Sequence, residues 1–307
     1  MLDKLQKKLL RTIANVTEDT PGALSIRSNG GSAKLVSTPS IQIIPLKGDK
    51  SGLDITIADN TKGESVHIPA IMTEPGVEMV YNNFHIGKNA DVEIVAGCGV
   101  HTCGDNLTQH DGVHSFVIGE NSRMKYVENH YGESEMVGGR NVLNPKTLIE
   151  VMNNGTAELE MVQIDGIDET VRDTEVILHD NAKLIITERL LTKKKQKAVS
   201  NVIVKLMGKD SSAQVISRSV AQDDSIQVFN MSIEGHNVSK GHIQCDSIIM
   251  GNARVESIPK IIAVDSRAEL IHEAAIGRIN SDQIIKLKTL GIEQEEAEDI
   301  ILKGFLS

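Results

Sequence analysis

The sequence predicts a mainly β protein of the solenoid class. From about residue 85, a Gly, Asn or Asp turn, a small residue and an alternating apolar strand recur roughly every 25–35 residues, a period typical of solenoid repeats. Aromatic residues make up only 2% of the chain, so we expect an aliphatic core built in regular layers. A β-sandwich has similar short strands, but its connections need not return at a fixed interval. The copies of the pattern lie at residues 87–95, 119–127, 154–162, 180–186, 208–216, 251–255 and 265–271.

The segments before the repeats predict a helix and then short strands. Residues 1–15 place Leu2, Leu5, Leu9 and Ile13 at helical spacing. Short β-like runs separated by turn signals follow between residues 20 and 65. We expect them at residues 23–27, 41–45 and 53–57.

The C-terminus changes character and predicts a small helical appendage. Residues 284–290 form an apolar helical pattern that Gly291 closes, and a second helix over about 293–303 ends at Gly304. Its apolar side chains are either a docking surface for a partner or packing against the β body. The sequence therefore divides into an N-terminal helix with its lead-in (1–20), a β core (21–278) and a helical segment (279–307). The docking candidates are Ile284, Leu287, Ile300 and Phe305.

Composition narrows the functional class. The chain has 307 residues, 40% of them hydrophobic and 24% charged, which is normal for a globular protein with a sizeable core. A formal net charge of −10 disfavours non-specific nucleic-acid binding, and the basic cluster at 193–197 fits a solvated loop. No signal peptide or long apolar segment is visible, and three cysteines do not make a disulfide framework. We therefore expect a cytoplasmic protein with reduced thiols.

The first candidate site combines Cys245 with His272 and Glu273. The two stretches are separated by about one expected coil, so these side chains would lie on neighbouring rungs. A thiolate, an imidazole and a carboxylate suit iron, zinc or an iron–sulfur cluster better than magnesium or calcium. The alternative is a half-buried free cysteine beside a salt-bridged Glu273. His242 would face away from Cys245 if this segment is a strand.

The second candidate site is residues 98–114, which are dense in potential ligands. The alternatives for this segment are a loop with solvated histidines, a sulfur-acceptor or transient metal-handling site, and a structural zinc site. Alternation along a strand would send successive side chains to opposite faces, and a reactive cysteine would need a lowered pKa. The remaining histidines at 130, 179 and 236 are interpreted as ordinary turn or core residues. The candidates are Cys98, His101, Cys103, His110 and His114.

The second half of the chain contains a series of short motifs, namely Gln244-Cys245-Asp246-Ser247, Gly251-Asn252-Ala253, Pro259, His272-Glu273-Ala274, Glu295-Glu296-Ala297 and Lys303-Gly304-Phe305-Leu306. In this order they resemble the SufB/SufD family of iron–sulfur assembly proteins. The likeness covers most of the chain from about residue 65 and is strongest over 241–306. The family resemblance implies a right-handed parallel β-helix with a C-terminal helical piece, a dimer, and an ABC-type ATPase, SufC, docked on the helical ends.

The same resemblance implies roles for individual residues. Cys245 and Glu273 fall where SufB-like members place the cysteine and glutamate of cluster assembly, with His272 in the same motif. Cys98 matches a cysteine proposed in SufB to receive sulfur from a donor. The chain is shorter than a full-length SufB and lacks the long N-terminal helical region and its cysteine-rich motif. It is similar to compact members found beside a single ATPase, which favours a homodimer over a heterodimer with a paralogue.

We therefore expect a scaffold for iron–sulfur cluster assembly rather than an enzyme. The chain has no Walker A motif, since residues 48–52 match only a fragment of it, so the ATPase would be the partner. A polysaccharide-cleaving solenoid enzyme would need aromatic platforms for sugars, which three Tyr and four Phe do not supply. A structural dimerisation partner of the ATPase, without a cluster site, is the remaining alternative.

Overall fold

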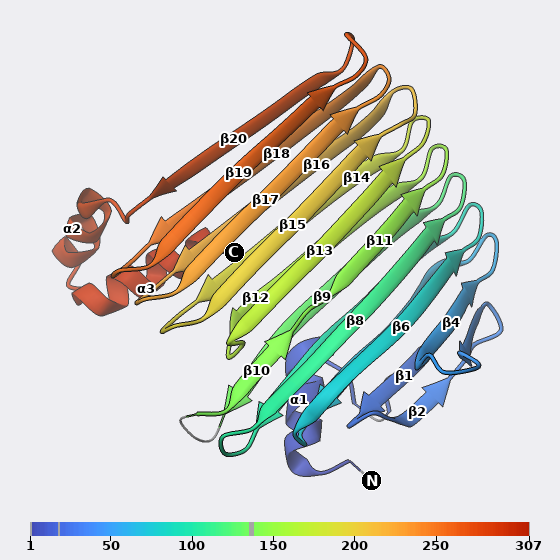
Figure 1. The fold of residues 1–307 in the computed structure, drawn as a ribbon, viewed down its shortest axis with the longest axis horizontal. Coiled ribbons are helices and arrows are strands. Elements are labelled where there is room, and N and C mark those ends of the chain that lie inside the picture. The colour runs from blue at the N-terminus through green and yellow to red at the C-terminus, as the bar shows by residue number, and fades with distance from the viewer. Residues whose placement is uncertain (1, 18, 135–137, 307) are drawn as a thin grey trace.

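The computed structural model describes residues 2–17, 19–134 and 138–306. The described residues form three helices and twenty strands, coiled into a solenoid from the N- to the C-terminal end (Figure 1). The helices are α1 (Lys4–Ala14), α2 (Ser281–Thr289) and α3 (Gln294–Phe305). The strands are β1 (Ala23–Ser28), β2 (Gly31–Val36), β3 (Ile41–Pro45), β4 (Gly52–Ile57), β5 (Lys62–Met72), β6 (Gly76–Ile86), β7 (Asp91–Thr102), β8 (Leu107–Ile118), β9 (Arg123–Ser134), β10 (Arg140–Leu143), β11 (Lys146–Val151), β12 (Thr156–Asp165), β13 (Glu169–Leu178), β14 (Lys183–Thr192), β15 (Lys197–Leu206), β16 (Ser211–Ala221), β17 (Ile226–Gly235), β18 (Ser239–Ile249), β19 (Arg254–Ala263) and β20 (Glu269–Gly277).

Within the described residues, the strands form two ten-stranded sheets whose order alternates along the chain. One sheet runs β2-β1-β5-β7-β9-β12-β14-β16-β18-β20, and the other runs β19-β17-β15-β13-β10-β8-β6-β4-β3, with β11 pairing β13 and β8. From β4 onward the chain therefore alternates between the sheets, with β10 and β11 together occupying one position, and these strands pair in parallel with strands one coil away. The β-solenoid predicted from the repeats is confirmed.

The repeated turn has a simple physical basis. One asparagine in each of several coils takes a left-handed backbone conformation, which Asn tolerates better than most residues. The next residue is small and buried, as at Ala90, Ser122 and Ala182, so it fits inside the bend. The turn asparagines with positive φ are Asn60, Asn89, Asn121, Asn154 and Asn181.

Side chains alternate between the core and the surface along the strands, as β13 shows with every second residue buried. One continuous hydrophobic cluster extends from Ala23 to Cys245 and is mostly Ile, Val, Leu, Ala and Met. Its aromatic members are few, and Phe84 stacks on Phe116 with ring centroids 4.5 Å apart. The aliphatic core expected from the composition is therefore present.

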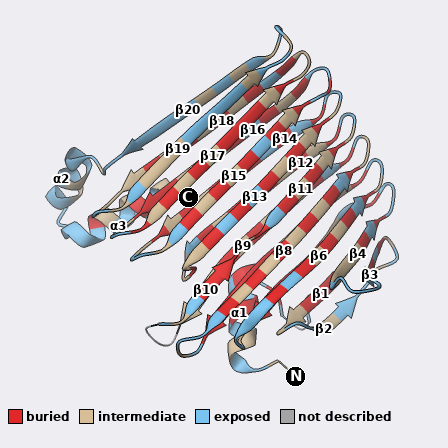
Figure 2. Cartoon of the chain, in the orientation of Figure 1, coloured by how far each residue is buried: buried red, intermediate tan, exposed pale blue. Residues whose placement is uncertain are grey.

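The two ends of the solenoid differ. At the N-terminal end, β2 pairs antiparallel with β1 and β3 pairs antiparallel with β4, and these strands are the last of their sheets. At the C-terminal end, β19 and β20 are the last strands in the described part of the chain, and most of their residues are exposed (Figure 2).

The helices lie at opposite ends of the solenoid (Figure 1). Helix α1 packs on the outer face of β5, β7 and β9, where a Cβ at Gly97 would lie 2.9 Å from Ile13 Cβ. Helices α2 and α3 contact each other at the C-terminal end, where α2 projects outward from the end of β20 (Figure 1). The second C-terminal helix runs to Phe305, so Gly304 lies in its last turn instead of ending it as the sequence had indicated.

Candidate functional site

Cys245 lies inside the last coils of the solenoid. It is carried by β18, is 1% exposed, and pairs in register with Ala274 of β20. Its Sγ lies 3.9 Å from His272 Nε2. Burial raises the pKa of the Cys245 thiol to about 12, although a hydrogen bond with Ser257 opposes this. The thiol is therefore protonated at neutral pH, and binding a metal would have to displace that proton.

His272 offers a second donor atom at the same place. The ring is half-buried, and burial followed by the charge of His242 lowers its pKa, so it is neutral at pH 7 and able to bind a metal. Its Nδ1 is buried and has no hydrogen-bond partner among the described residues. Since Nε2 faces Cys245, the Cys245–His272 pair presents one sulfur and one nitrogen ligand in the open last coil.

Glu273 lies on the opposite, outer face of β20. It pairs in register with Gln244, and its Oε2 is 3.2 Å from His242 Nε2. The Glu273 side chain is 64% exposed. The structure thus brings Cys245 and His272 together on the inner face of the sheet, and it places Glu273 and His242 together on the outer face. Alternation along the strand causes the separation.

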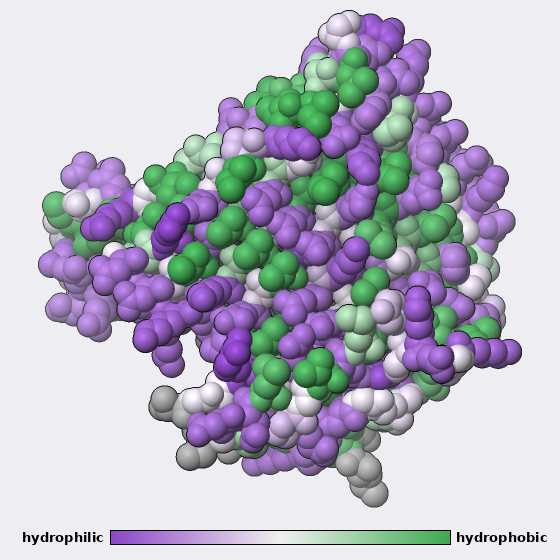
Figure 3. All heavy atoms as spheres, viewed as in Figure 1, coloured by the Kyte–Doolittle hydropathy of each residue, from purple (hydrophilic) through white to green (hydrophobic). Residues whose placement is uncertain are grey.

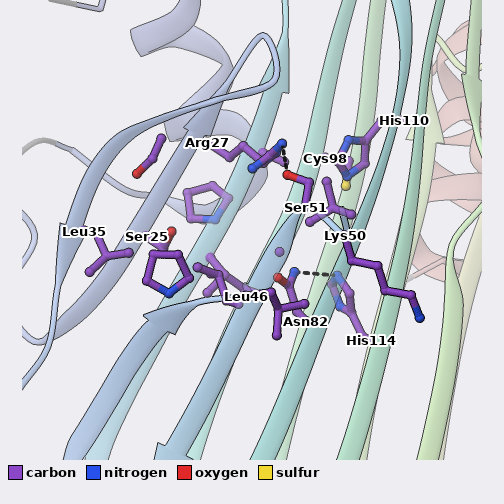
Figure 4. Close-up of a pocket in the computed structure, with 18 of the residues that line it drawn as sticks. Ser25, Arg27, Leu35, Leu46, Lys50, Ser51, Asn82, Cys98, His110 and His114 are labelled. Carbon is purple, nitrogen blue, oxygen red and sulfur yellow. Dashed lines mark hydrogen bonds between the residues drawn. The ribbon is translucent and has the colours of Figure 1, made fainter. Parts of the chain in front are cut away.

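Cys98 lies inside the solenoid at the N-terminal half, in β7. It is 7% exposed and faces His110 of β8, as the sulfur beside the labelled ring in Figure 4 shows. Burial alone would raise the pKa of this thiol, but the charges and hydrogen bonds of His110 and His130 outweigh burial and lower it to about 6. The thiolate in turn raises the pKa of His110, with help from Glu78, to about 10 against the effect of burial. Cys98 and His110 therefore form a thiolate–imidazolium pair at neutral pH.

A carboxylate and a guanidinium continue this arrangement. His110 Nδ1 lies 3.1 Å from Glu78 Oε2. The other carboxylate oxygen of Glu78 accepts a hydrogen bond from Nε of Arg27. Arg27 also donates to Ser51 Oγ at 2.7 Å, which holds the guanidinium at the surface end of the cluster. A chain of contacts through Ser51, Arg27, Glu78 and His110, each from a different strand or turn, thus connects the surface with the Cys98 sulfur.

A cavity of about 370 Å³ opens beside this cluster (Figure 4). Asn82 and His114 form its inner wall, where Asn82 Nδ2 lies 3.4 Å from His114 Nε2. His114 Nδ1 donates to the Tyr126 hydroxyl at 2.7 Å, because that hydroxyl itself donates to Glu128 at 2.9 Å. Burial lowers the pKa of His114 to about 4, so this histidine is neutral.

Further charged groups are buried deeper in the core. Arg172 is 4% exposed, donates to Glu128, and lies 3.1 Å from His130 Nδ1. Its Nε is 3.7 Å from Oε1 of Glu188. Burial alone would raise the pKa of Glu128, but the charges of His130 and Arg172 hold it well below its ordinary value.

The polar side chains continue towards the last coils. Glu188 accepts hydrogen bonds of 2.8 Å from both Ser200 and Ser217. Ser217 is the register neighbour of Cys245 on the adjacent strand. The interior therefore holds a line of polar groups between the two buried cysteines.

The segment 98–114 does not bring its candidate zinc ligands together. Its donors are divided: His101 is buried, Cys103 is exposed, and His110 and His114 are hydrogen-bonded to Glu78 and Tyr126. In the part of the chain that the structure describes, no group of three or more His, Cys, Asp or Glu side chains is placed to hold a metal ion. The alternative of zinc at 98–114 is therefore not supported, and the strands β7 and β8 also replace the solvated loop.

Sequence reasoning missed several members of these clusters. Glu78, Arg172 and Arg27 were not singled out, and His130 was interpreted as an ordinary histidine. A signal was present, because charged residues at inward positions of an alternating strand must be paired. Using that signal requires knowing which alternate positions of each strand face the core.

The C-terminal helices expose part of their apolar surface. Ile300 is 43% exposed, whereas Ile284, Leu287 and Phe305 are half-buried. Leu290, at the end of α2, is 76% exposed, and Ile285 is 56% exposed. No helix among the described residues has both the length and the apolar character needed to cross a membrane.

The last coil of the solenoid thus carries a buried cysteine–histidine pair, a sulfur and a nitrogen donor of the kinds that bind iron. A family model described as SUF system FeS cluster assembly, SufBD core domain, matches residues 72–305. The chain belongs to this SufBD family, and the family supports a role in iron–sulfur cluster assembly.

Curated relatives agree with this assignment. An iron–sulfur cluster assembly SufBD family protein of Methanocaldococcus jannaschii is 34% identical over 62% of this chain and 60% of its own length. One from Pyrococcus horikoshii is 29% identical over 89% of this chain and 84% of its own. One from Archaeoglobus fulgidus is 24% identical over 75% of this chain and 60% of its own. The match thus spans less than two thirds of two of these three relatives.

Proposed function

We propose that this protein is a scaffold on which iron and sulfide are assembled into a cluster at Cys245. The observation that carries the proposal is the Cys245–His272 pair, a sulfur and a nitrogen donor 3.9 Å apart in a coil left open at the end of the solenoid. Iron accepts both kinds of ligand, and the unpaired Nδ1 of His272 shows that this ring is not fully used by the protein itself.

The scaffold would work as a dimer formed through β19 and β20. One protomer offers a single thiolate here, whereas two copies together offer two thiolates and two imidazoles. Exposed apolar side chains lie on the last strands, and Figure 3 shows hydrophobic residues among hydrophilic ones on the face that includes the C-terminal coils. Glu273 lies on the outer face of this last strand, so in this proposal it belongs to the dimer interface and is not beside Cys245. The exposed apolar residues are Ile258, Ile261, Ile271 and Ile276.

A SufC-like ABC-type ATPase would dock on α2 and α3. Leu290, Ile285 and Ile300 are exposed there, on or beside two helices that contact each other. ATP binding by the partner would shift these helices and change the contacts of the adjoining last coil. Replacing Leu290 with Asp should weaken binding to the ATPase in isothermal titration. Val77→Asp, at a site 65% exposed on β6, is the matched control and should leave binding unchanged.

Cys98 is the proposed sulfur acceptor, since its thiolate is available at neutral pH. The proposal places the protein in the cytoplasm, because the three cysteines Cys98, Cys103 and Cys245 are free and a reducing compartment preserves them.

Anaerobic reconstitution with iron and sulfide, followed by absorbance and EPR spectroscopy, tests the scaffold. Wild type should give a cluster spectrum, Cys245→Ala should lose it, and the exposed-cysteine control Cys103→Ala should keep it. His272→Ala should give a weaker spectrum. Because the Cys245 thiol must lose its proton, loading should improve as pH rises.

The same experiment separates the scaffold from a structural dimerisation partner. If wild type takes up neither iron nor sulfide while the dimer and the ATPase complex form normally, the structural role is the better account. If Cys245→Ala loads as well as wild type, the cluster site lies elsewhere.

A further inference from the structure

Cys98, His110 and Glu78 are arranged as a nucleophile, a base and an orienting carboxylate. The His110 ring faces the Cys98 sulfur on one side (Figure 4), and its Nδ1 lies 3.1 Å from Glu78 Oε2 on the other. Arg27 then fixes the second oxygen of Glu78. Nucleophilic cysteines are activated by this order of groups, in which a third residue sets the position of the histidine.

The surroundings favour transfer of sulfur over transfer of an acyl group. Acyl transfer needs free hydrogen-bond donors aimed at a developing oxyanion. The Cys98 backbone lies in the middle of parallel ladders, paired with Ala70 on one side and His130 on the other. Its amide is therefore committed to the sheet. Attack on a sulfane sulfur, a sulfur atom bonded to another sulfur, produces no tetrahedral oxyanion and needs no such donors.

Access to the sulfur is restricted to the cavity. On the outer face of β7, helix α1 covers the strand so closely that a Cβ at Gly97 or Gly99 would lie 2.9 Å or 3.2 Å from side-chain atoms of Ile13 or Leu9. On the inner face the thiol is only 7% exposed, in a cavity of about 370 Å³. A folded donor protein would have to insert a narrow segment to reach it, whereas a small molecule fits.

The cavity also has polar character suited to a small anion bearing an S–H group. Arg27 and Lys50 lie on its lining, and the His110 imidazolium faces the sulfur (Figure 4). Asn82 Oδ1 is buried and lacks a hydrogen-bond partner among the described residues. The orientation of the amide follows from the contact of its nitrogen, which donates to neutral His114. The oxygen is therefore the atom that can accept a hydrogen bond from a bound molecule.

We propose that the Cys98–His110–Glu78 unit takes a sulfur atom from a small inorganic sulfane anion, such as hydrodisulfide (HSS⁻), bound in this cavity. The step rests on the proposed role of Cys98 as sulfur acceptor and specifies its substrate class. A bond forms between Cys98 Sγ and one sulfur of the donor, and the S–S bond of the donor breaks. The electron pair leaves with the other sulfur as HS⁻. The net exchange, Cys98–S⁻ plus HSS⁻ giving Cys98–SS⁻ plus HS⁻, conserves atoms, charge and electrons, so it needs no external oxidant.

Anaerobic incubation of the whole chain with hydrodisulfide, and separately with thiosulfate, tests the proposal by peptide mass spectrometry. The expected result is a mass increase of one sulfur atom on the Cys98 peptide of wild type and of Cys103→Ser, and none at that peptide in Cys98→Ser. Glu78→Gln acts through His110 as a positioning variant. It should slow labelling at least several-fold and move the pH midpoint of the rate upwards, a change that loss of folding alone does not produce. Circular dichroism confirms folding of each variant.

A protein-donor arm distinguishes the possible failures. Labelling of Cys98 only by a cysteine desulfurase supplied with cysteine would overturn the small-donor inference and leave Cys98 as the acceptor. Labelling of Cys98 by neither source would overturn both. Equal rates of Cys98 labelling and equal pH midpoints in wild type and Glu78→Gln would refute the activation of Cys98 through His110 and Glu78. Cluster formation at Cys245 from free sulfide is measured independently and does not depend on these outcomes.

Discussion

Replacing Arg172 with Met should destabilise the solenoid strongly, because it leaves buried carboxylates without their cation. Glu128 is 1% exposed and accepts a hydrogen bond from Arg172, and Glu188 lies 3.7 Å from the same guanidinium. Removing one partner of a buried ion pair costs about 3–5 kcal/mol, whereas replacing both partners is often neutral. We therefore expect Arg172→Met to lower the free energy of unfolding by about 3–5 kcal/mol.

The matched control is the double variant Arg172→Met with Glu128→Gln. A neutral amide at position 128 still accepts the hydrogen bond from the Tyr126 hydroxyl, which lies 2.9 Å from the carboxylate in wild type. The double variant should therefore recover most of the lost stability, and the cycle measures the coupling between the two charges. Urea unfolding followed by far-UV circular dichroism is the appropriate assay, since the chain contains no Trp. A loss below about 1 kcal/mol in the single variant, or a double variant as unstable as the single one, would refute this reasoning.

The pH dependence of the same pair has a definite sign. In wild type the folded-state pKa of Glu128 is depressed, so its contribution to stability is present above the ordinary value of 4.5 and is lost as pH falls. Without Arg172 the carboxyl is more easily protonated in the folded state. The difference in stability between wild type and Arg172→Met should therefore be largest at neutral pH and should narrow below about pH 4.5.

Three further outcomes are expected. Alkylation of Cys98 by iodoacetamide should rise with pH around a midpoint of about 6, and His110→Ala should move that midpoint upwards; an unchanged midpoint would contradict the ion pair. Cys245, with a pKa of about 12, should react slowly at neutral pH in the same peptide-resolved experiment unless the native packing is lost. Gly97→Ala should lower the free energy of unfolding by about 1–3 kcal/mol, because the added Cβ would push α1 outwards. The control Gly277→Ala, where a Cβ meets nothing within 4 Å, should leave stability nearly unchanged.

The fold was accessible from the sequence because its signals are local and repeated. The turn around Asn89 and the alternation after it recur in coil after coil, and each copy predicts the same turn and strand. The helical ends were also visible, with α2 starting at Ser281 and α1 carrying the predicted apolar stripe.

The site was only partly accessible, because its geometry depends on register. The ladder joins Cys245 to Ala274, a step of 29 residues, so Glu273 is one position out of phase and points to the other face. An approximate period of the repeat cannot resolve a difference of one residue. The cluster around Cys98 joins Arg27 and Glu78 to His110 through pairings between distant strands, which a period also does not specify.

The unequal ends of the solenoid limit how many copies can join through their strands. The edge strands at the N-terminal end, β2 and β3, have six and five residues, whereas β19 and β20 at the other end have ten and nine. Short edge strands disfavour pairing with another molecule. A molecule whose edge strands paired readily at both ends would add copies head to tail and form a fibre. If pairing occurs only through β19 and β20, two copies related by a two-fold axis cover these edges in both molecules. No further copy can then be added, and assembly stops at the dimer. The short N-terminal edge strands would thus disfavour the growth of a fibre from a fold that has long parallel strands.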